Sequence, residues 1–173
     1  ISKDGEYSIV GTQPWSSCTH CPEIFSFNKS SSTPLWNYTT GTRTGSVAVS
    51  ADGEYIVVAA GTYTGKVHLY DKDSNTPIWN YSYGSNVESK SVAISADGKY
   101  IISGGAGGKI RFFSKDSSTP LWTAGIGSGH VYEVDISGDG KYAGMLGSFE
   151  CSLVDKPDIT FNVSGMDDKI RNS

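Results

Sequence analysis

Short runs in which apolar and polar residues alternate with a period of two recur along the chain, and turn-forming residues separate them. The clearest unit is residues 91–122, SVAISADGKYIISGGAGGKIRFFSKDSSTPLW. Its alternation predicts strands over residues 91–95, 100–104 and 109–114, and a fourth strand that begins at Leu121. The second run is nearly continuous in apolar and small residues, which is typical of a strand buried on both faces. Because no run shows apolar residues at helical spacing, the unit predicts four short strands and no helix.

The same unit recurs through the chain at a period of about 40–50 residues, which points to propellers, solenoids or arrays. Residues 46–79 repeat it closely, residues 1–36 repeat it without its first few residues, and residues 131–163 repeat it in altered form. The landmarks are Asp-Gly turns that end at Gly5, Gly53, Gly98 and Gly140, and the evenly spaced Trp36, Trp79 and Trp122. Four short strands in every repeat favour the blades of a β-propeller.

Two segments of the sequence resemble motifs of known propeller families. Residues 129–142, GHVYEVDISGDGKY, resemble the opening of a WD repeat. Residues 76–79, TPIW, followed by Gly84, are similar to the tryptophan-docking motif of pyrroloquinoline-quinone-type propellers, although Pro77 stands where that family usually carries glycine. The second resemblance implies tryptophans that pack between adjacent blades and a ring of eight blades. Neither resemblance implies an activity, because a shared fold does not fix function.

We therefore expect an all-β propeller with four four-stranded blades, over about residues 1–44, 45–87, 88–130 and 131–165. Blade one lacks most of its innermost strand, and in blade four Phe161 and Gly165 stand roughly where tryptophan and glycine stand in the other blades.

His68 aligns with Ser26 and Arg111, which indicates a solvated or inter-blade position.

Residues 166–173 are a candidate for the missing strand. Written ahead of Ile1 they give KIRNS-ISKDGEY, which aligns with the start of the repeat at Lys90. A gap of one strand would expose unpaired backbone edges, which proteins normally avoid. Closure within one chain gives a four-bladed ring, whereas closure between two chains gives an eight-bladed homodimer with twofold symmetry. An open piece of a longer propeller is the third alternative, and the tryptophan-docking resemblance favours the homodimer.

Composition narrows the class of protein. The chain has 173 residues, of which 18% are charged and 37% hydrophobic, and 21 are glycine, which is typical of one turn-rich β domain. It has no apolar run of about 18 residues that could span a bilayer. The net charge is −4 and lysine and arginine are not clustered, which argues against a nucleic-acid partner. Glycosylation sequons at Asn28, Asn37, Asn80 and Asn162 weakly favour an extracellular or cell-surface location.

Successive turns of an antiparallel blade alternate between two faces of the propeller. The Asp-Gly turns and the Asp-Ser-Ser-Thr-Pro-type turns share one face and hardly vary, whereas the turns after the second strand and the links between blades share the other face and vary widely. Function commonly lies on loops held by a rigid scaffold, so we expect this variable loop face to bind a ligand. The candidate ligand-binding residues on it are Trp15, His20, Arg43, Tyr63, Glu88, Lys90 and His130.

The insertion at residues 12–23 contains Cys18, His20 and Cys21, a C-x-x-C pair with a histidine between. Thiolate and imidazole suit zinc, but a closed structural site needs a fourth ligand, and the chain has no second C-x-x-C pair. A redox disulfide is a second alternative, without the helix that usually accompanies it. We favour a structural disulfide or a reduced pair, so no cofactor is firmly predicted and zinc stays possible.

Three functions compete. The regular repeats and the absence of a nucleophile–base pair favour a non-enzymatic binding or scaffold module for a protein, peptide or glycan. The alternative is a quinone- or metal-dependent enzyme with a site on the ring axis, for which the candidates are Arg43, Glu88, Lys90, Glu133 and Asp135. The third possibility is a piece of a larger surface protein whose function lies elsewhere.

Overall fold

The structure is a computed structural model. It describes residues 1–13, 23–61, 63–85, 87–125, 129–148, 151–155 and 161–162. In these residues the strands are β1 (Tyr7–Gly11), β2 (Ile24–Asn28), β3 (Trp36–Tyr38), β4 (Thr44–Val49), β5 (Tyr55–Ala60), β6 (Lys66–Asp71), β7 (Trp79–Ser82), β8 (Ser89–Ile94), β9 (Tyr100–Gly105), β10 (Lys109–Ser114), β11 (Trp122–Gly125), β12 (Val131–Ile136), β13 (Tyr142–Gly147), β14 (Cys151–Asp155) and β15 (Phe161–Asn162). The described residues contain no helix, as predicted.

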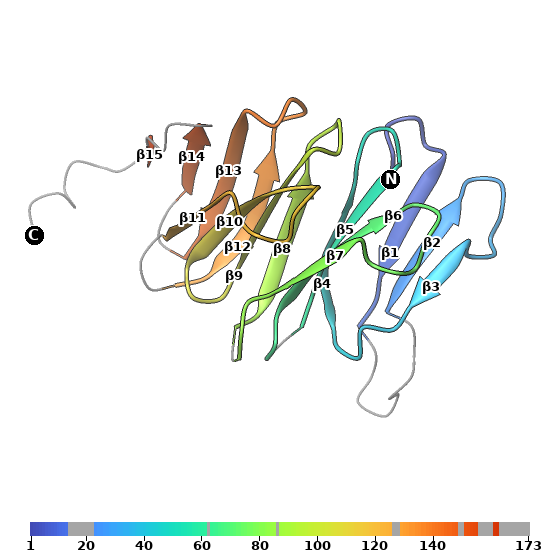
Figure 1. The fold of residues 1–173 in the computed structure, drawn as a ribbon, viewed down its shortest axis with the longest axis horizontal. Helices are drawn as coiled ribbons and strands as arrows, with labels where there is room; N and C mark the ends of the chain where they lie inside the picture. Colours follow the sequence, from blue (N-terminus) through green and yellow to red (C-terminus); the bar gives the residue numbers. More distant parts are fainter. Residues whose placement is uncertain are drawn as a thin grey trace, which may run out of the picture.

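The strands form four antiparallel sheets in chain order: β1-β2-β3, β4-β5-β6-β7, β8-β9-β10-β11 and β12-β13-β14-β15. Figure 1 shows them side by side along the long axis of the molecule. We call them blades one to four. The first strands β4, β8 and β12 are the inner strands, and β8 lies against both β4 and β12. Blade one has three strands and no inner strand, as expected, and no ring closes within the described residues. The proposed closing strand, residues 166–173, lies outside them.

The Asp-Gly turns have one hydrogen-bond pattern. The hydroxyl of Ser95 donates to Asp97 Oδ1 at 2.7 Å, and that oxygen also accepts the Lys99 N–H at 3.1 Å. The Tyr100 N–H in turn donates to Ser95 Oγ at 3.0 Å. The turn ends at Gly98, whose φ of 69° lies in the left-handed region that favours glycine. The same bonds recur at Ser2-Asp4, Ser50-Asp52 and Ser137-Asp139.

Neighbouring blades are joined at these turns. The Lys3 N–H donates to the Ala51 carbonyl at 3.0 Å, the Ala51 N–H to the Ala96 carbonyl at 3.0 Å, and the Ala96 N–H to the Gly138 carbonyl at 2.9 Å. In blades one to three, a tyrosine ring also packs under the turn glycine of the next blade. The pairs are Tyr7 with Gly53, Tyr55 with Gly98, and Tyr100 with Gly140.

Trp36 and Trp79 bridge adjacent blades, as the resemblance implied, whereas Trp122 stacks on Phe112 of its own blade with ring centroids 5.1 Å apart. The indole N–H of Trp79 donates to the Lys115 carbonyl in blade three at 2.7 Å, and its ring lies 5.5 Å from the Phe113 ring. The indole N–H of Trp36 makes the same bond to the Lys72 carbonyl in blade two at 2.6 Å. The predicted blade-to-blade role is therefore confirmed for both residues.

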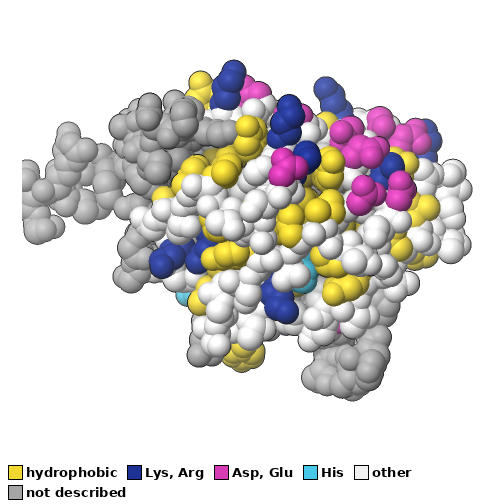
Figure 2. All heavy atoms as spheres, in the orientation of Figure 1, with side chains coloured by type: hydrophobic (Ala, Val, Ile, Leu, Met, Phe, Trp, Pro, Cys, Tyr) yellow, Lys and Arg dark blue, Asp and Glu magenta, His cyan; other side chains and the backbone are white. Residues whose placement is uncertain are grey.

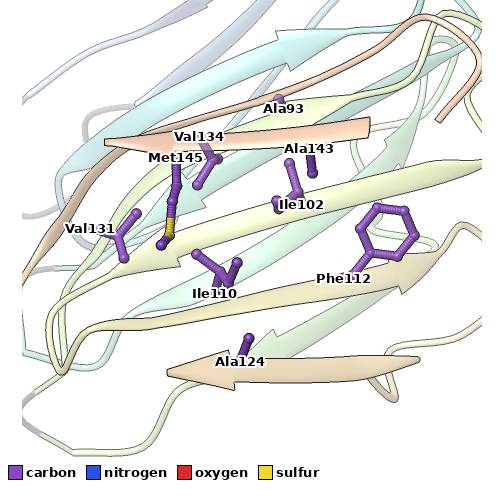
Figure 3. Close-up of a cluster of buried hydrophobic side chains, with 9 residues drawn as sticks. All are labelled: Ala93, Ile102, Ile110, Phe112, Ala124, Val131, Val134, Ala143 and Met145. Carbon is purple, nitrogen blue, oxygen red and sulfur yellow. The ribbon is translucent and has the colours of Figure 1, made fainter. Parts of the chain in front are cut away.

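The hydrophobic core is divided into three clusters, one at each interface between blades. Figure 3 shows the cluster between blades three and four, where Ala93, Ile102, Ile110, Phe112 and Ala124 meet Val131, Val134, Ala143 and Met145. Each sheet is therefore stabilised mainly by its neighbours, as expected of stacked repeats.

Buried polar side chains occupy one equivalent position in two interfaces. His68 is 5% exposed, with its ring 6.2 Å from the Tyr38 ring of blade one. Arg111 is 8% exposed, and its Nε donates to the Tyr81 hydroxyl of blade two at 3.0 Å. Burial, and secondly the charge of Lys66, lower the pKa of His68 to about 4. The inter-blade alternative for His68 is therefore the correct one.

Two register predictions were wrong by one residue. The β1–β2 pairing places Phe25, and not Ser26, at the position of His68. In blade four, the β14–β15 pairing places Asn162, and not Phe161, at the position that tryptophan occupies in other blades. Both errors arise because strand partners, and not spacing along the chain, fix the register.

Candidate functional site

Each complete inner strand begins on the loop face with a β-bulge. The pairing register shifts between Thr44 and Ser46, between Ser89 and Ser91, and between Val131 and Glu133. The additional residues at these shifts are Gly45, Lys90 and Tyr132. A bulge locally disrupts the ladder and redirects a side chain, and bulges are common beside functional sites.

Gly45 and Lys90, the bulge residues of β4 and β8, each face the inner strand of the following blade. A Cβ atom placed on Gly45 would lie 2.8 Å from the Ser89 carbonyl oxygen, so this position faces the next inner strand, β8. Lys90 on β8 extends in the same direction, and its Nζ lies 6.0 Å from the centroid of the Tyr132 ring on β12. An ammonium group at this distance from an aromatic ring is in the range of a cation–π interaction.

These residues form a small cluster with Glu88 and His130. Lys90 Nζ lies 2.7 Å from Glu88 Oε2, and the two side chains are 25% and 35% exposed. The rings of His130 and Tyr132 stack, with centroids 6.1 Å apart and planes 22° apart. Tyr132 is 52% exposed. We call Glu88, Lys90, His130 and Tyr132 the axial cluster; it combines an aromatic surface with one ion pair.

Backbone hydrogen bonds hold the axial cluster between blades three and four. The Ser148 N–H donates to the His130 carbonyl at 2.9 Å, and the His130 N–H donates to Ser148 Oγ at 2.9 Å. Ser148 Oγ also lies 3.4 Å from the Tyr132 hydroxyl. Ala106 forms an isolated antiparallel β-bridge with His130, and its N–H donates to the Glu88 carbonyl at 2.9 Å. The cluster thus lies on a fixed backbone.

The two faces of the molecule differ in charge. Figure 2 shows charged side chains gathered along the upper edge, over the Asp-Gly turns, and few along the opposite edge formed by the loops. Ion pairs on the turn edge include Lys99 with Asp97 at 3.1 Å and Lys141 with Asp139 at 3.2 Å. The Glu88–Lys90 pair belongs to the loop face.

The structure brings together three of the predicted site residues: Glu88, Lys90 and His130. Arg43 lies elsewhere, with its Nε donating to Gln13 Oε1 at 3.1 Å. Tyr63 is 76% exposed. Trp15, Cys18, His20 and Cys21 lie outside the described residues, so the zinc, redox and structural alternatives for the insertion stay predictions. Within the part of the chain that the structure describes, no three His, Cys, Asp or Glu side chains are grouped as metal ligands.

The candidates for an enzyme-like axial site are spread over separate places. Arg43 bonds to Gln13, and Glu88 pairs with Lys90. Glu133 and Asp135 instead line, together with Leu146, a concavity of about 270 Å³ on blade four. These residues do not form one set that fits a quinone and its metal, so we derive no step through such a cofactor.

Sequence reasoning missed Tyr132, although a signal was present. Gly45, Lys90 and Tyr132 each precede a phrase that recurs in every complete repeat: SVAVS, SVAIS and EVDIS. A residue that differs between otherwise similar repeats is a candidate for function and not for the fold. The bulge itself depends on pairing between strands, which spacing along the chain does not show.

The family model described as WD domain, G-beta repeat, matches residues 78–114. The match and the repeated antiparallel sheets fit a WD-repeat-like β-propeller. The matched residues cover β7 at the edge of blade two and then β8, β9 and β10 of blade three. No curated protein matches the chain. Among the described residues, no helix has the length and apolar character needed to cross a membrane.

Proposed function

We propose that the chain is a non-enzymatic interaction module that binds a protein or peptide on its loop face, with the axial cluster at the centre of the contact. The observation that carries this proposal is the stacked, half-exposed Tyr132 beside the Glu88–Lys90 pair, held on paired strands. Tyrosine is enriched among the residues that dominate protein interfaces, because it combines a large apolar surface with a hydroxyl group.

The WD-repeat match supports a protein-interaction scaffold in general terms. The choice of a peptide ligand over a glycan rests on the ion pair. A peptide can satisfy Lys90 and Glu88 with its own charged side chains or termini and can place an apolar side chain on Tyr132. The proposed location stays the extracellular or cell-surface one that the glycosylation sequons suggest.

Selection of random peptides on the immobilised chain tests the proposal. We expect peptides that bind the wild type and lose about 30-fold in affinity with Tyr132→Ala, the factor for an interface residue worth about 2 kcal/mol. Lys99→Ala is the control for a change on the turn face, where Lys99 pairs with Asp97. Equal affinities for wild type and Tyr132→Ala would contradict the axial cluster, and binding only to a glycan panel would contradict the peptide ligand.

We further propose that two chains complete an eight-bladed ring and that residues 166–173 supply the inner strand of blade one. This is supported by the absence of an inner strand beside β1 in the described sheet. A cavity of about 130 Å³ also lies between the end of β1 and β4, lined by Gly11 and residues 44–47. Light scattering tests the ring: we expect the mass of two chains, and the mass of one chain would contradict it.

A further inference from the structure

We propose that a second copy of the chain docks head to tail, with the outer face of its blade one on the outer face of blade four. The inference rests on the proposed two-chain ring and identifies the surfaces that form it. We call the two surfaces the leading face, on blade four, and the trailing face, on blade one. The leading face includes Tyr142 and Leu146, and the trailing face includes Gly5, Val10 and Phe27.

Tyr142 of blade four and Gly5 of blade one do not make the inter-blade contact that their equivalents make in the described residues. At all three interfaces within the chain, a tyrosine of one blade packs under the turn glycine of the next. Tyr142 is the equivalent tyrosine of blade four, and it is 46% exposed. Gly5 is the equivalent glycine of blade one, and no atom lies within 4 Å of a Cβ placed on it. One copy therefore has an exposed tyrosine side chain on blade four and, beside Gly5 on blade one, the open place that such a side chain would fill.

The backbone hydrogen bonds between the Asp-Gly turns all run in one direction along the series of blades. In each case the N–H of one turn donates to the carbonyl of the turn in the following blade, from Lys3 to Ala51, from Ala51 to Ala96, and from Ala96 to Gly138. The next bond in this series would run from the Gly138 N–H of one copy to the Lys3 carbonyl of the other. At the two ends of the series, the Gly138 N–H and the Lys3 carbonyl are thus equivalent to the donors and acceptors that bond within the chain.

Apolar side chains are exposed at both ends of the series of blades. Val58 and Tyr70 are fully buried where blade two meets blade one. The register places Val10 and Phe27 at the same positions on blade one, and there Val10 is 44% exposed and Phe27 is half-buried. On blade four, Leu146 is 49% exposed at the position where Ala59 in blade two is fully buried. Apolar surface left open in this way is typical of an interaction site.

A second copy of the chain fits these faces because they continue an interface that already occurs three times in the molecule. The leading face of one copy matches the trailing face of another and does not match itself. Such a contact is heterologous, and two of them related by a twofold axis close a ring, whereas an angle that does not close produces a filament. The proposed two-chain ring is the closed case.

Tyr142→Ala in the full chain tests the docking faces. Tyr142 does not lie against any of the described glycines, so we expect the variant to fold. We expect its two-chain dissociation constant, measured by sedimentation, to rise about 30-fold, the factor for loss of a central interface residue. Tyr63→Ala is the control, because Tyr63 is 76% exposed on the loop face. It should leave the dissociation constant unchanged.

Gly5→Ala provides a second test from the opposite face, because its methyl group would occupy the place of the partner's tyrosine ring. Gly41→Ala is the matched control: the φ angles are 73° and 72°, and a Cβ on either residue meets no atom within 4 Å. We expect Gly5→Ala alone to weaken association. Circular dichroism of all four variants would show whether each one is folded.

The outcomes separate the docking faces from the ring. If the wild type has the mass of one chain at all concentrations, both proposals are wrong. If it has the mass of two chains and neither Tyr142→Ala nor Gly5→Ala alters the dissociation constant, the ring stands and the docking faces are wrong. If the wild type forms larger assemblies that both variants dissolve, the docking faces stand and the closed ring is wrong. Peptide binding, measured on wild type and Tyr142→Ala, is a separate readout of the axial cluster.

Discussion

Gly98→Ala measures how strongly one blade is stabilised by packing on the next. Gly98 has a φ of 69°, and a Cβ added to it would lie 2.5 Å from Cδ2 of Tyr55 in the preceding blade. The left-handed backbone conformation costs a non-glycine residue about 1–2 kcal/mol. Forcing a methyl group into a well-packed interface costs about 1–3 kcal/mol more. Alanine also restricts the unfolded chain, which offsets the cost by about 0.4–1 kcal/mol.

Gly41→Ala isolates the packing contribution. Gly41 has a φ of 72°, and a Cβ added to it meets no atom within 4 Å. The backbone and unfolded-state effects are therefore nearly equal in the two variants, and the difference between them is the contact with Tyr55. We expect Gly98→Ala to lower the free energy of unfolding by about 1–3 kcal/mol more than Gly41→Ala.

Urea unfolding followed by tryptophan fluorescence provides the comparison, at one protein concentration for all variants. A further 1–3 kcal/mol corresponds to a melting temperature lower by about 2–12 °C for a chain of this size. Gly98→Ala should cost less in a Tyr55→Ala background than in the wild type, because the ring that the methyl group meets is then absent. Equal losses in Gly98→Ala and Gly41→Ala would refute the inter-blade role of the turn glycine.

The remaining predictions concern inter-blade contacts and the axial cluster. In the folded chain the pKa of His68 is lowered to about 4. Between pH 6.5 and 4 the unfolded chain therefore binds more protons than the folded chain does. The contribution of His68 to the free energy of unfolding is thus lost as the pH falls through this range. We expect a loss of at most about 3 kcal/mol that His68→Leu abolishes; urea unfolding at several pH values that shows the same slope in both proteins would contradict it. Trp79→Phe leaves the Lys115 carbonyl without its indole donor, and the free energy of unfolding should fall by about 1–3 kcal/mol in urea titrations. Replacing Lys90 and Tyr132 together by alanine should abolish peptide binding and change that free energy by no more than about 0.5 kcal/mol; a large destabilisation would assign the pair to the fold.

The turns and tryptophans could be predicted from sequence because their chemistry is local and recurs in every repeat. A serine, an aspartate and a glycine within four residues are sufficient to define the bonded turn at Ser95, Asp97 and Gly98. The recurrence of the tryptophans, together with the tryptophan-docking resemblance, likewise indicated packing between repeats, which Trp36 and Trp79 show. Local motifs of this kind do not depend on which strand lies beside them.

The axial cluster could be predicted only in part, because it depends on pairing across strands. Glu88, Lys90 and His130 were recognised as residues of the variable face, but nothing in the spacing indicated that Lys90 extends toward the next inner strand. The bulge that redirects Lys90 and Tyr132 appears only when β8 and β12 are paired with their neighbours. The same dependence on strand partners explains the errors of one residue in the register of blades one and four.

Amide hydrogen exchange of the wild-type chain, with and without a selected peptide, tests the central claim most directly. The account predicts slower exchange in the bound state at residues 87–90, 105–108 and 129–132, which surround the axial cluster, and unchanged exchange at the Asp-Gly turns. Slower exchange at turn residues 51–53 and 96–98, with none at the loop face, would contradict it.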